Sequence, residues 1–135
     1  MLFVFLEKPM NAYEVIARYD EERNNNEKFD NKLTWIEELE HTVLSDVILT
    51  HKNDIESPET YFDEWSADTP LLIPVPYTDC YVHYIDMKLN MKLNQLKKYN
   101  NASTMFNNTY ITFQQWYNRH NKPLSTKRWF NHEVL

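Results

Sequence analysis

Apolar side chains recur at helical spacing over much of the chain. Between residues 30 and 50 they stand at intervals of three and four, with acidic side chains mostly off that stripe. The positions on the stripe are Leu33, Ile36, Leu39, Val43, Leu44, Val47 and Ile48. One apolar face with a period of 3.6 residues predicts an amphipathic core helix from about Asp30 to about Thr50.

Two more helices are predicted near the ends of the chain. The first begins at Asn11, because Asn11 and Glu14 have the spacing of a capping box. The last ends near Arg119, and Pro123 prevents its continuation. Its stripe is aromatic and consists of Phe106, Tyr110, Phe113 and Trp116 or Tyr117.

A further helix is predicted from near Pro76 to about Tyr99, with a break at Asn100–Asn101 unless the helix continues through them. It is apolar on two sides, which places it either at the centre of the core or between the core and a partner. One side carries Val82, Ile85, Leu89, Leu93 and Leu96, and the other carries Cys80, Tyr84, Met87 and Met91. Tyr84, Met87 and Met91 are therefore candidate contacts with another subunit or partner.

Residues 51–76 lose the helical period, and prolines interrupt them. This segment carries three aromatic side chains, Tyr61, Phe62 and Trp65, among acidic ones. Loops of this length in compact domains are usually functional or disordered. We expect an ordered loop that packs these aromatics on the core or on a partner, and residues 71–73 have the composition of a short strand.

These patterns predict an all-α fold, a small bundle of about four helices with a long loop at 51–76. A chain of 135 residues fits one domain. We expect an extended N-terminal arm at 1–10, a helical domain at 11–120 and an extended C-terminal tail at 121–135. No segment has the composition of a signal peptide or a membrane span, so we expect a soluble protein made in a reducing cytoplasm, with no membrane partner.

The composition excludes several classes of site. The chain has no glycine, so it cannot contain a P-loop, a dinucleotide-binding fingerprint or a nucleophile elbow, all of which require glycine. Fifteen asparagines supply the next residue type that tolerates left-handed backbone, so turns and helix ends are expected to rely on Asn and Pro.

The remaining polar residues give little sign of chemistry, and we expect no enzymatic activity, cofactor or metal ion. The histidines and the single cysteine, Cys80, lack the spacing of a zinc site. Cys80 and His83 lie within one helical turn, but a buried structural thiol is the favoured interpretation. Glu37, Glu38 and Glu40 are interpreted as a solvated helix face rather than as general acids or bases.

Charge is unevenly divided along the chain. Residues 1–68 hold 6 Lys and Arg against 17 Asp and Glu, a balance of −11, whereas residues 69–135 hold 8 against 3, a balance of +5. The acidic part of one copy could face the basic part of another, or the two halves could attract each other within one monomer.

The C-terminal tail combines cations with aromatic side chains. Such a segment can bind single-stranded nucleic acid by charge and stacking, or anchor in a protein pocket. Three cations in a chain of net charge −6 are a weak signal for nucleic acid, so the protein pocket is favoured. The residues concerned are Lys122, Lys127, Arg128, Trp129 and Phe130.

One long segment also resembles a known group of proteins. The residues that carry the resemblance are Leu71-Leu72-Ile73-Pro74-Val75-Pro76-Tyr77, Tyr81, His83, Tyr84, Tyr99-Asn100-Asn101, Met105-Phe106-Asn107, Tyr110, Phe113, Trp116-Tyr117-Asn118-Arg119 and Pro123. Trp35-Ile36, Glu38-Leu39 and Thr50-His51 fit the same pattern, so it covers about residues 11–123. The chain is similar to head-tail connector proteins, of the adaptor or head-completion type, from tailed phages and prophages of Gram-positive bacteria.

The resemblance implies a structural protein of the virion neck. Such adaptors form a ring, often of twelve copies, beneath the portal protein, extend the DNA channel and receive the next neck or tail component. DNA passes through without sequence-specific binding. Their C-terminal segment commonly reaches into the portal, which implies portal-binding roles for Lys122, Pro123, Lys127, Arg128, Trp129 and Phe130.

Two alternatives stay open. The chain could be a cytoplasmic helical regulator that binds a protein partner through residues 58–72. It could also be a neck protein at another position, such as a stopper or a tail completion protein. Those proteins are more often β-rich, whereas this chain is predicted to be mostly helical.

Overall fold

Five α-helices account for most of residues 9–124, the part of the chain that the computed structural model describes. They are α2 (Ala12–Glu22), α3 (Phe29–Asp46), α4 (Pro58–Asp63), α5 (Asp79–Lys92) and α6 (Leu96–His120), and a 3-10 turn, η1 (Ile48–Thr50), follows α3. The prediction of an all-α bundle with about four main helices is confirmed, and the described residues form no strand. None of these helices is long and apolar enough to cross a membrane.

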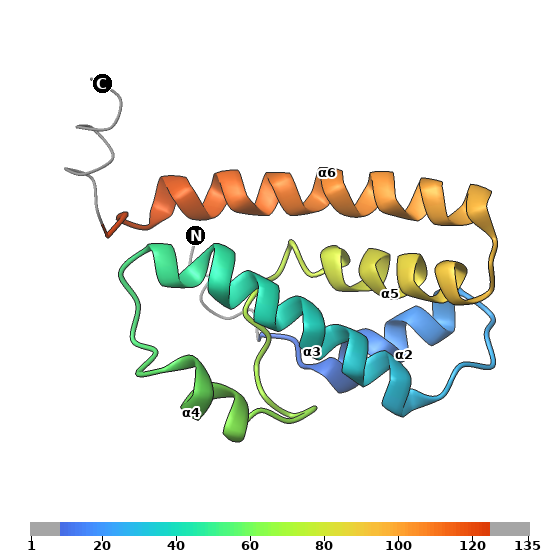
Figure 1. Cartoon of the computed structure of the whole chain (residues 1–135), viewed down its shortest axis with the longest axis horizontal. Coiled ribbons are helices and arrows are strands. Elements are labelled where there is room, and N and C mark those ends of the chain that lie inside the picture. The colour runs from blue at the N-terminus through green and yellow to red at the C-terminus, as the bar shows by residue number, and fades with distance from the viewer. Residues whose placement is uncertain (1–8, 125–135) are drawn as a thin grey trace.

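Helix α5 is the central element of the bundle. It contacts α2, α3 and α6, and α6 runs along the length of the molecule as an outer layer (Figure 1). The largest fully buried side chains are Tyr19, Tyr81 and Phe113, which come from α2, α5 and α6. Helix α3 adds the buried side chains of Ile36 and Leu39, so the core is built from all the long helices, and α6 contributes to it from one side.

The start of α2 matches the predicted capping box. The Oδ1 atom of Asn11 accepts a hydrogen bond from the Glu14 backbone N–H at 3.0 Å, and Glu14 Oε1 accepts one from the Asn11 N–H at 3.0 Å. These two bonds satisfy donors that have no partner within the helix. Val15, Ile16 and Tyr19 then face the core, so the local sequence accounts for both the start and the orientation of α2.

The long amphipathic helix is present but shorter than predicted. Helix α3 buries Ile36, Leu39 and Val43, as the apolar stripe requires. It ends at Asp46, and the chain continues through the tighter turn η1 to Thr50. The Thr50 hydroxyl donates a hydrogen bond to the Val47 carbonyl at 2.7 Å, which stabilises this tighter turn.

The predicted boundary between the last two helices is wrong. Helix α5 begins at Asp79 rather than near Pro76, because residues 74–78 form turns, and it ends at Lys92. Asn94 has a φ of 57°, in the left-handed region that terminates a helix and that Asn tolerates. Asn100 and Asn101 instead lie inside α6. The expected use of Asn at helix ends is confirmed, but at a different asparagine.

The predicted loop at 51–76 contains a helix and no strand. Ser57 caps α4 by accepting a hydrogen bond from the Thr60 N–H, and Pro58 occupies the first turn. Residues 71–73 form no ladder, because the backbone N–H groups of Leu72 and Ile73 donate to side chains on α3 and α5. The strand prediction at 71–73 is therefore wrong, while the expectation of an ordered segment is met.

Candidate functional site

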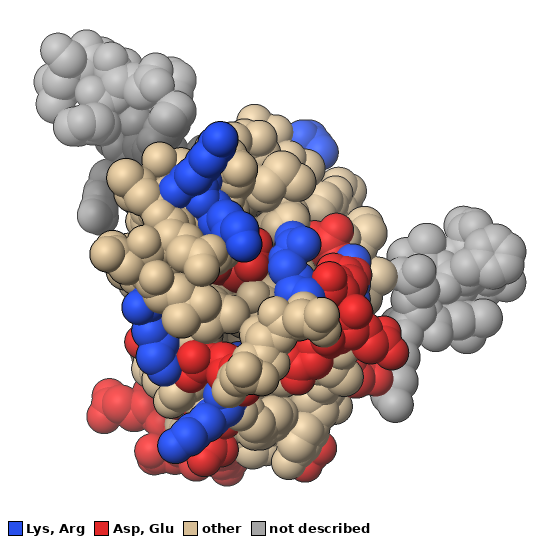
Figure 2. Space-filling view, turned by 90° about the vertical axis from the view of Figure 1, so that its right-hand side faces the viewer, with Lys and Arg blue, Asp and Glu red and all other residues tan. Residues whose placement is uncertain are grey.

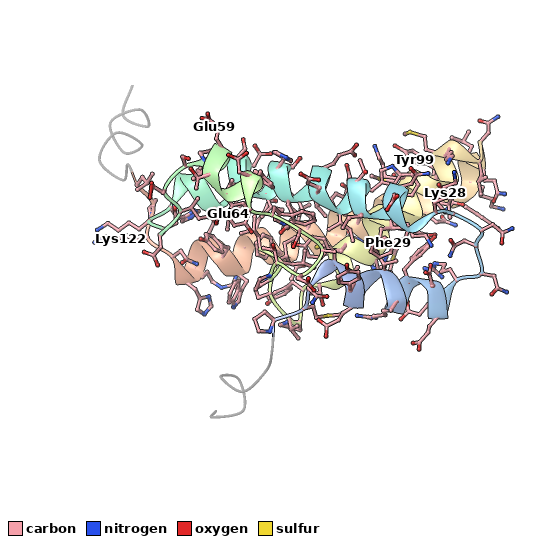
Figure 3. All side chains as sticks on the ribbon, turned by 90° about the horizontal axis from the view of Figure 1, so that it is seen from below. Lys28, Phe29, Glu59, Glu64, Tyr99 and Lys122 are labelled. Atoms are coloured by element: carbon pink, nitrogen blue, oxygen red, sulfur yellow. The ribbon has the colours of Figure 1, made fainter. Side chains whose placement is uncertain are left out.

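The predicted contact residues lie in three places on the bundle. One set is on or beside α4, another is on α5, and a third is at the C-terminal end of α6. Figure 3 shows Glu59 and Glu64, from the α4 segment, and Lys122 toward the end of the molecule opposite to Lys28, Phe29 and Tyr99. The α4 segment and the start of the predicted tail therefore lie toward the same end of the molecule.

The aromatic side chains of the α4 segment pack partly on the chain's own core. Tyr61, Phe62 and Trp65 are half-buried and contact the hydrophobic core. The Phe62 ring stacks on the imidazole of His41, with the ring centroids 3.6 Å apart. This stacking attaches α4 to α3 and leaves only part of each aromatic surface available to a partner.

The acidic side chains of the same segment face solvent. Within residues 9–124, none of them forms an ion pair. All are exposed, and they are Asp54, Glu56, Glu59, Asp63, Glu64 and Asp68. The α4 segment is thus a negatively charged surface with aromatic edges between the charges.

The second side of α5 is only partly free. Tyr84 packs against Phe106 of α6, with ring centroids 5.3 Å apart, and its pKa is raised to about 12 by burial. Met87 is partly exposed, and Met91 is 55% exposed near the end of the helix. Of the three predicted contact residues on α5, Met91 therefore offers the most surface to a partner.

The beginning of the predicted tail is attached to the bundle. The Lys52 N–H donates to the Lys122 carbonyl at 3.1 Å, and the Leu124 N–H donates to the Thr50 carbonyl at 3.1 Å. His51 and Pro123 form an isolated antiparallel bridge between these bonds. The side chains of Lys122 and Pro123 are exposed. Lys127, Arg128, Trp129 and Phe130 lie outside the described residues.

One acidic residue of α3 does not lie on the solvated face that was predicted for it. Glu40 is fully buried, whereas Glu37 is partly exposed and the exposed Glu38 pairs with Lys88 at 3.2 Å. Glu40 Oε1 accepts a hydrogen bond from the Tyr81 hydroxyl at 2.5 Å, and Oε2 accepts one from the Leu72 N–H at 3.0 Å. The carboxylate therefore joins α3, α5 and the segment after α4.

The environment of Glu40 shifts its ionisation toward the neutral form. Burial raises the pKa of Glu40 to about 7, and the hydrogen bonds from Tyr81 and Leu72 oppose this shift. The buried indole N–H of Trp65 also lies near the carboxylate and lowers its pKa, without a hydrogen bond of normal geometry. A shift of this kind is common in active sites, but this group is enclosed by the core and has no access to a substrate.

Cys80 and His83 do not form a reactive pair. Cys80 is fully buried, and burial raises the pKa of its thiol to about 12, so that the thiolate needed for nucleophilic attack is disfavoured. Burial also lowers the pKa of the half-buried His83. The interpretation of Cys80 as a small buried hydrophobic residue is confirmed.

A polar pocket that the sequence does not predict lies where α2 and α5 end and α6 begins. It has a volume of about 690 Å³, within the range of ligand sites, and amide side chains of Asn24, Asn26, Asn90, Gln95 and Asn101 contribute to its lining. Figure 2 looks onto this end of the molecule, where Lys and Arg side chains stand beside Asp and Glu. No local sequence motif predicts such a pocket, because its lining combines residues of α2, the loop after α2, α5 with the turn that follows it, and α6.

Three of the four Asp, Glu, Lys and Arg residues that line this pocket are held in ion pairs; they are Arg23, Glu27 and Asp86, and the fourth is Lys98. Asp86 accepts a hydrogen bond from the Tyr19 hydroxyl at 3.0 Å and pairs with Arg23 at 3.4 Å. Glu27 pairs with Lys92 at 2.8 Å, and this hydrogen bond lowers the pKa of Glu27. In the described part of the chain, no group of three or more His, Cys, Asp or Glu side chains is arranged to hold a metal ion. The pocket therefore presents polar groups without an obvious acid–base pair.

Part of the charge asymmetry is neutralised within the monomer. Lys88 and Lys92, from the basic half, pair with Glu38 and Glu27 from the acidic half. The carboxylates of the α4 segment take no part in such pairs. Attraction between the halves of one chain thus joins α5 to α3 and to Glu27 in the segment before α3, and contacts between copies stay a prediction.

Comparison of the chain with protein-family models, with curated proteins and with solved structures found no match.

Proposed function

We propose that the chain is a head-tail connector of the adaptor type, a structural protein of the phage neck. In this role it would form a ring, typically of twelve copies, beneath the portal protein. The ring would extend the DNA channel and receive the next neck or tail protein. The proposal rests on the resemblance of residues 71–123, and the all-α bundle is compatible with it.

The observation that carries the proposal is the place of the resembling segment in the fold. It forms the hairpin of α5 and α6, the two helices of the described chain that contact each other most extensively. The aromatic residues of the resemblance lie at this interface: Tyr84 packs on Phe106, and Tyr77 packs on Trp116 with ring centroids 5.5 Å apart. The motif residues therefore act as the packing residues of one supersecondary unit.

The C-terminal end of this hairpin supports a role in docking. Hydrogen bonds to Thr50 and Lys52 hold residues 122–124 in place, while the side chains of Lys122, Pro123 and Leu124 are exposed. A tail that leaves a rigid bundle at a fixed point loses less entropy on binding than one that leaves a mobile segment. We propose that residues 122–135 bind the portal protein.

Co-purification with the portal protein of the same genome tests this role. The full chain is compared with a version that ends at Asn121. We expect the full chain to bind portal rings and the truncated chain to lose binding. Binding that survives truncation would keep the adaptor role but move the anchor to the helices or the α4 segment.

A matched charge change separates tail binding from general electrostatics. The double variant K127E/R128E changes the tail by four charge units, and K97E/K98E makes the same change at the exposed first turn of α6. We expect only the first variant to lose portal binding. Absence of binding by the unmodified full chain, even to assembled portal rings, would refute the adaptor proposal and favour a regulator that acts through the α4 segment.

A further inference from the structure

The longest helix carries a long run without charge. Residues 99–118 contain no Asp, Glu, Lys or Arg, although charged residues make up 25% of the chain. The run occupies most of α6, and cations stand only near its ends, at Lys97, Lys98 and Arg119. At 1.5 Å per residue it spans roughly 30 Å.

Much of this run faces away from the bundle. Helix α6 buries Ala102 and Phe113 toward α5, and the opposite side packs on no described element (Figure 1). The side chains on this outer face are all exposed and none of them is charged. They are Asn100, Thr104, Asn107, Asn108, Ile111, Gln115 and Asn118.

Exposed helix faces of soluble proteins normally carry charged side chains, whereas the centres of protein interfaces are depleted of charge. Large exposed apolar residues of the described chain also concentrate in and near this helix, and Ile111 is the one that the outer face includes, whereas Met105 lines the polar pocket. Six of the eight lie between residues 91 and 124, and three of these, Leu96, Met105 and Ile111, are on α6. The outer face of α6 therefore has the composition of a contact surface.

We propose that the outer face of α6 binds the same face of a second copy of this chain. An amide both donates and accepts hydrogen bonds, so a row of Asn and Gln side chains is complementary to itself. A row of carboxylates can only accept hydrogen bonds and a row of ammonium groups can only donate them, so neither is complementary to itself. The amide-rich outer face is thus suited to meet its own copy.

The distribution of charge permits a second copy to bind at this face although the net charge opposes it. Two copies each carry a formal charge of −6 and repel one another wherever their acidic surfaces meet. The outer face of α6 is an uncharged strip about 30 Å long, so it lets two copies approach without pairing like charges. Ile111, which is 50% exposed, lies near the middle of this strip and supplies an apolar centre.

The cations at both ends of α6 restrict the geometry. Lys97 and Lys98 of one copy would meet like charges of the other in a side-by-side pair, whether parallel or antiparallel. Two helices that cross near Ile111 keep their ends apart, and crossing angles near −50° are common for packed helices. A single helix face of this size buries less than roughly 800 Å² per partner, so the association is weak and reversible.

Disulfide cross-linking tests the contact and its geometry. Cys80 is buried, so a cysteine introduced on α6 becomes the accessible thiol of the described chain. We expect the I111C variant to form a covalent dimer rapidly in the presence of a mild oxidant. The N100C variant places its thiol on the same face but near the helix end, and we expect its dimer to form at least about tenfold more slowly. Equal rates for both variants, or no dimer from I111C, would overturn the crossed pair.

Charge substitutions test whether the face binds itself. N108K lowers the net negative charge and so weakens general repulsion, but it places like charges together at the proposed contact. We expect N108K to weaken association about tenfold in sedimentation equilibrium, and T42K, an equal change at an exposed site on α3, to leave it unchanged or stronger.

A mixture of the N108K and N108D variants should associate more strongly than either variant alone, because opposite charges then meet across the contact. A full chain that stays monomeric up to about 1 mM would refute the proposal. Neither experiment contains the portal protein, so these outcomes are independent of those that test the adaptor role.

Discussion

Replacement of Glu40 with Gln tests the most unexpected feature of the core, a buried carboxyl group between α3 and α5. Burial raises the pKa of Glu40 from the model-peptide range to about 7. In the unfolded chain the carboxyl titrates near 4.5. Folding therefore favours the protonated form, and the free energy of unfolding should fall as the pH rises from about 4.5 through 7.

The magnitude follows from the two pKa values. One pKa unit corresponds to about 1.4 kcal/mol, so the shift costs the folded state about 3 kcal/mol above pH 7 and nothing below pH 4. Gln cannot ionise, so this pH-dependent cost is absent from E40Q. Gln has a single acceptor oxygen for the donors Tyr81 and Leu72, which adds a cost of about 1–3 kcal/mol that does not vary with pH.

Urea denaturation of both proteins, followed by circular dichroism between pH 4 and pH 8, measures the effect. The stability of E40Q relative to the natural chain should rise by about 3 kcal/mol across this range. E37Q is the matched control, because Glu37 is a partly exposed carboxylate on the same helix, and its relative stability should change much less than that of E40Q across this range. A pH dependence that is the same in all three proteins would show that Glu40 titrates normally and would refute the argument.

Three further results are expected. N11A removes the side-chain acceptor of the capping box and should lower the free energy of unfolding by about 1 kcal/mol in urea denaturation. F113A empties a fully buried position on α6 and should cost about 3–5 kcal/mol, visible as a large drop in melting temperature, whereas I111A on the outer face should change it little. Iodoacetamide at pH 8 should leave Cys80 unmodified in the folded chain and label it after unfolding, as mass spectrometry would detect.

Burial of Glu40 also shows why a helical pattern is an incomplete guide to the surface. Glu37, Glu38 and Glu40 form one acidic cluster in the sequence, and two of the three do contact solvent or a surface lysine. Glu40 is drawn inward because a hydroxyl and a backbone N–H from distant segments point at it. Tyr81 and Leu72, which donate these hydrogen bonds, lie 41 and 32 positions after Glu40 in the sequence. A short sequence window around Glu40 therefore contains neither donor.

The sequence contains local signals that predict helix α4. Ser57, Pro58 and Glu59 form a helix start, with a capping hydroxyl, a proline in the first turn and an acidic residue beside the positive end of the helix dipole. Pro58 was counted among residues that break helices, although proline is favourable in the first turn. The polar pocket and the outer face of α6, by contrast, depend on which surfaces the bundle leaves uncovered.

The sequence by itself determined the all-α class, the start of α2 and the inward stripes of α3 and α6. Helical period and capping are local properties, set by residues three or four positions apart. The tertiary structure alone decided that Glu40 is buried, that α5 ends at Lys92 rather than near Tyr99, and that residues 122–124 pair with residues 50–52. Those outcomes depend on contacts between segments far apart in the chain, whose energies are comparable to local preferences and can override them.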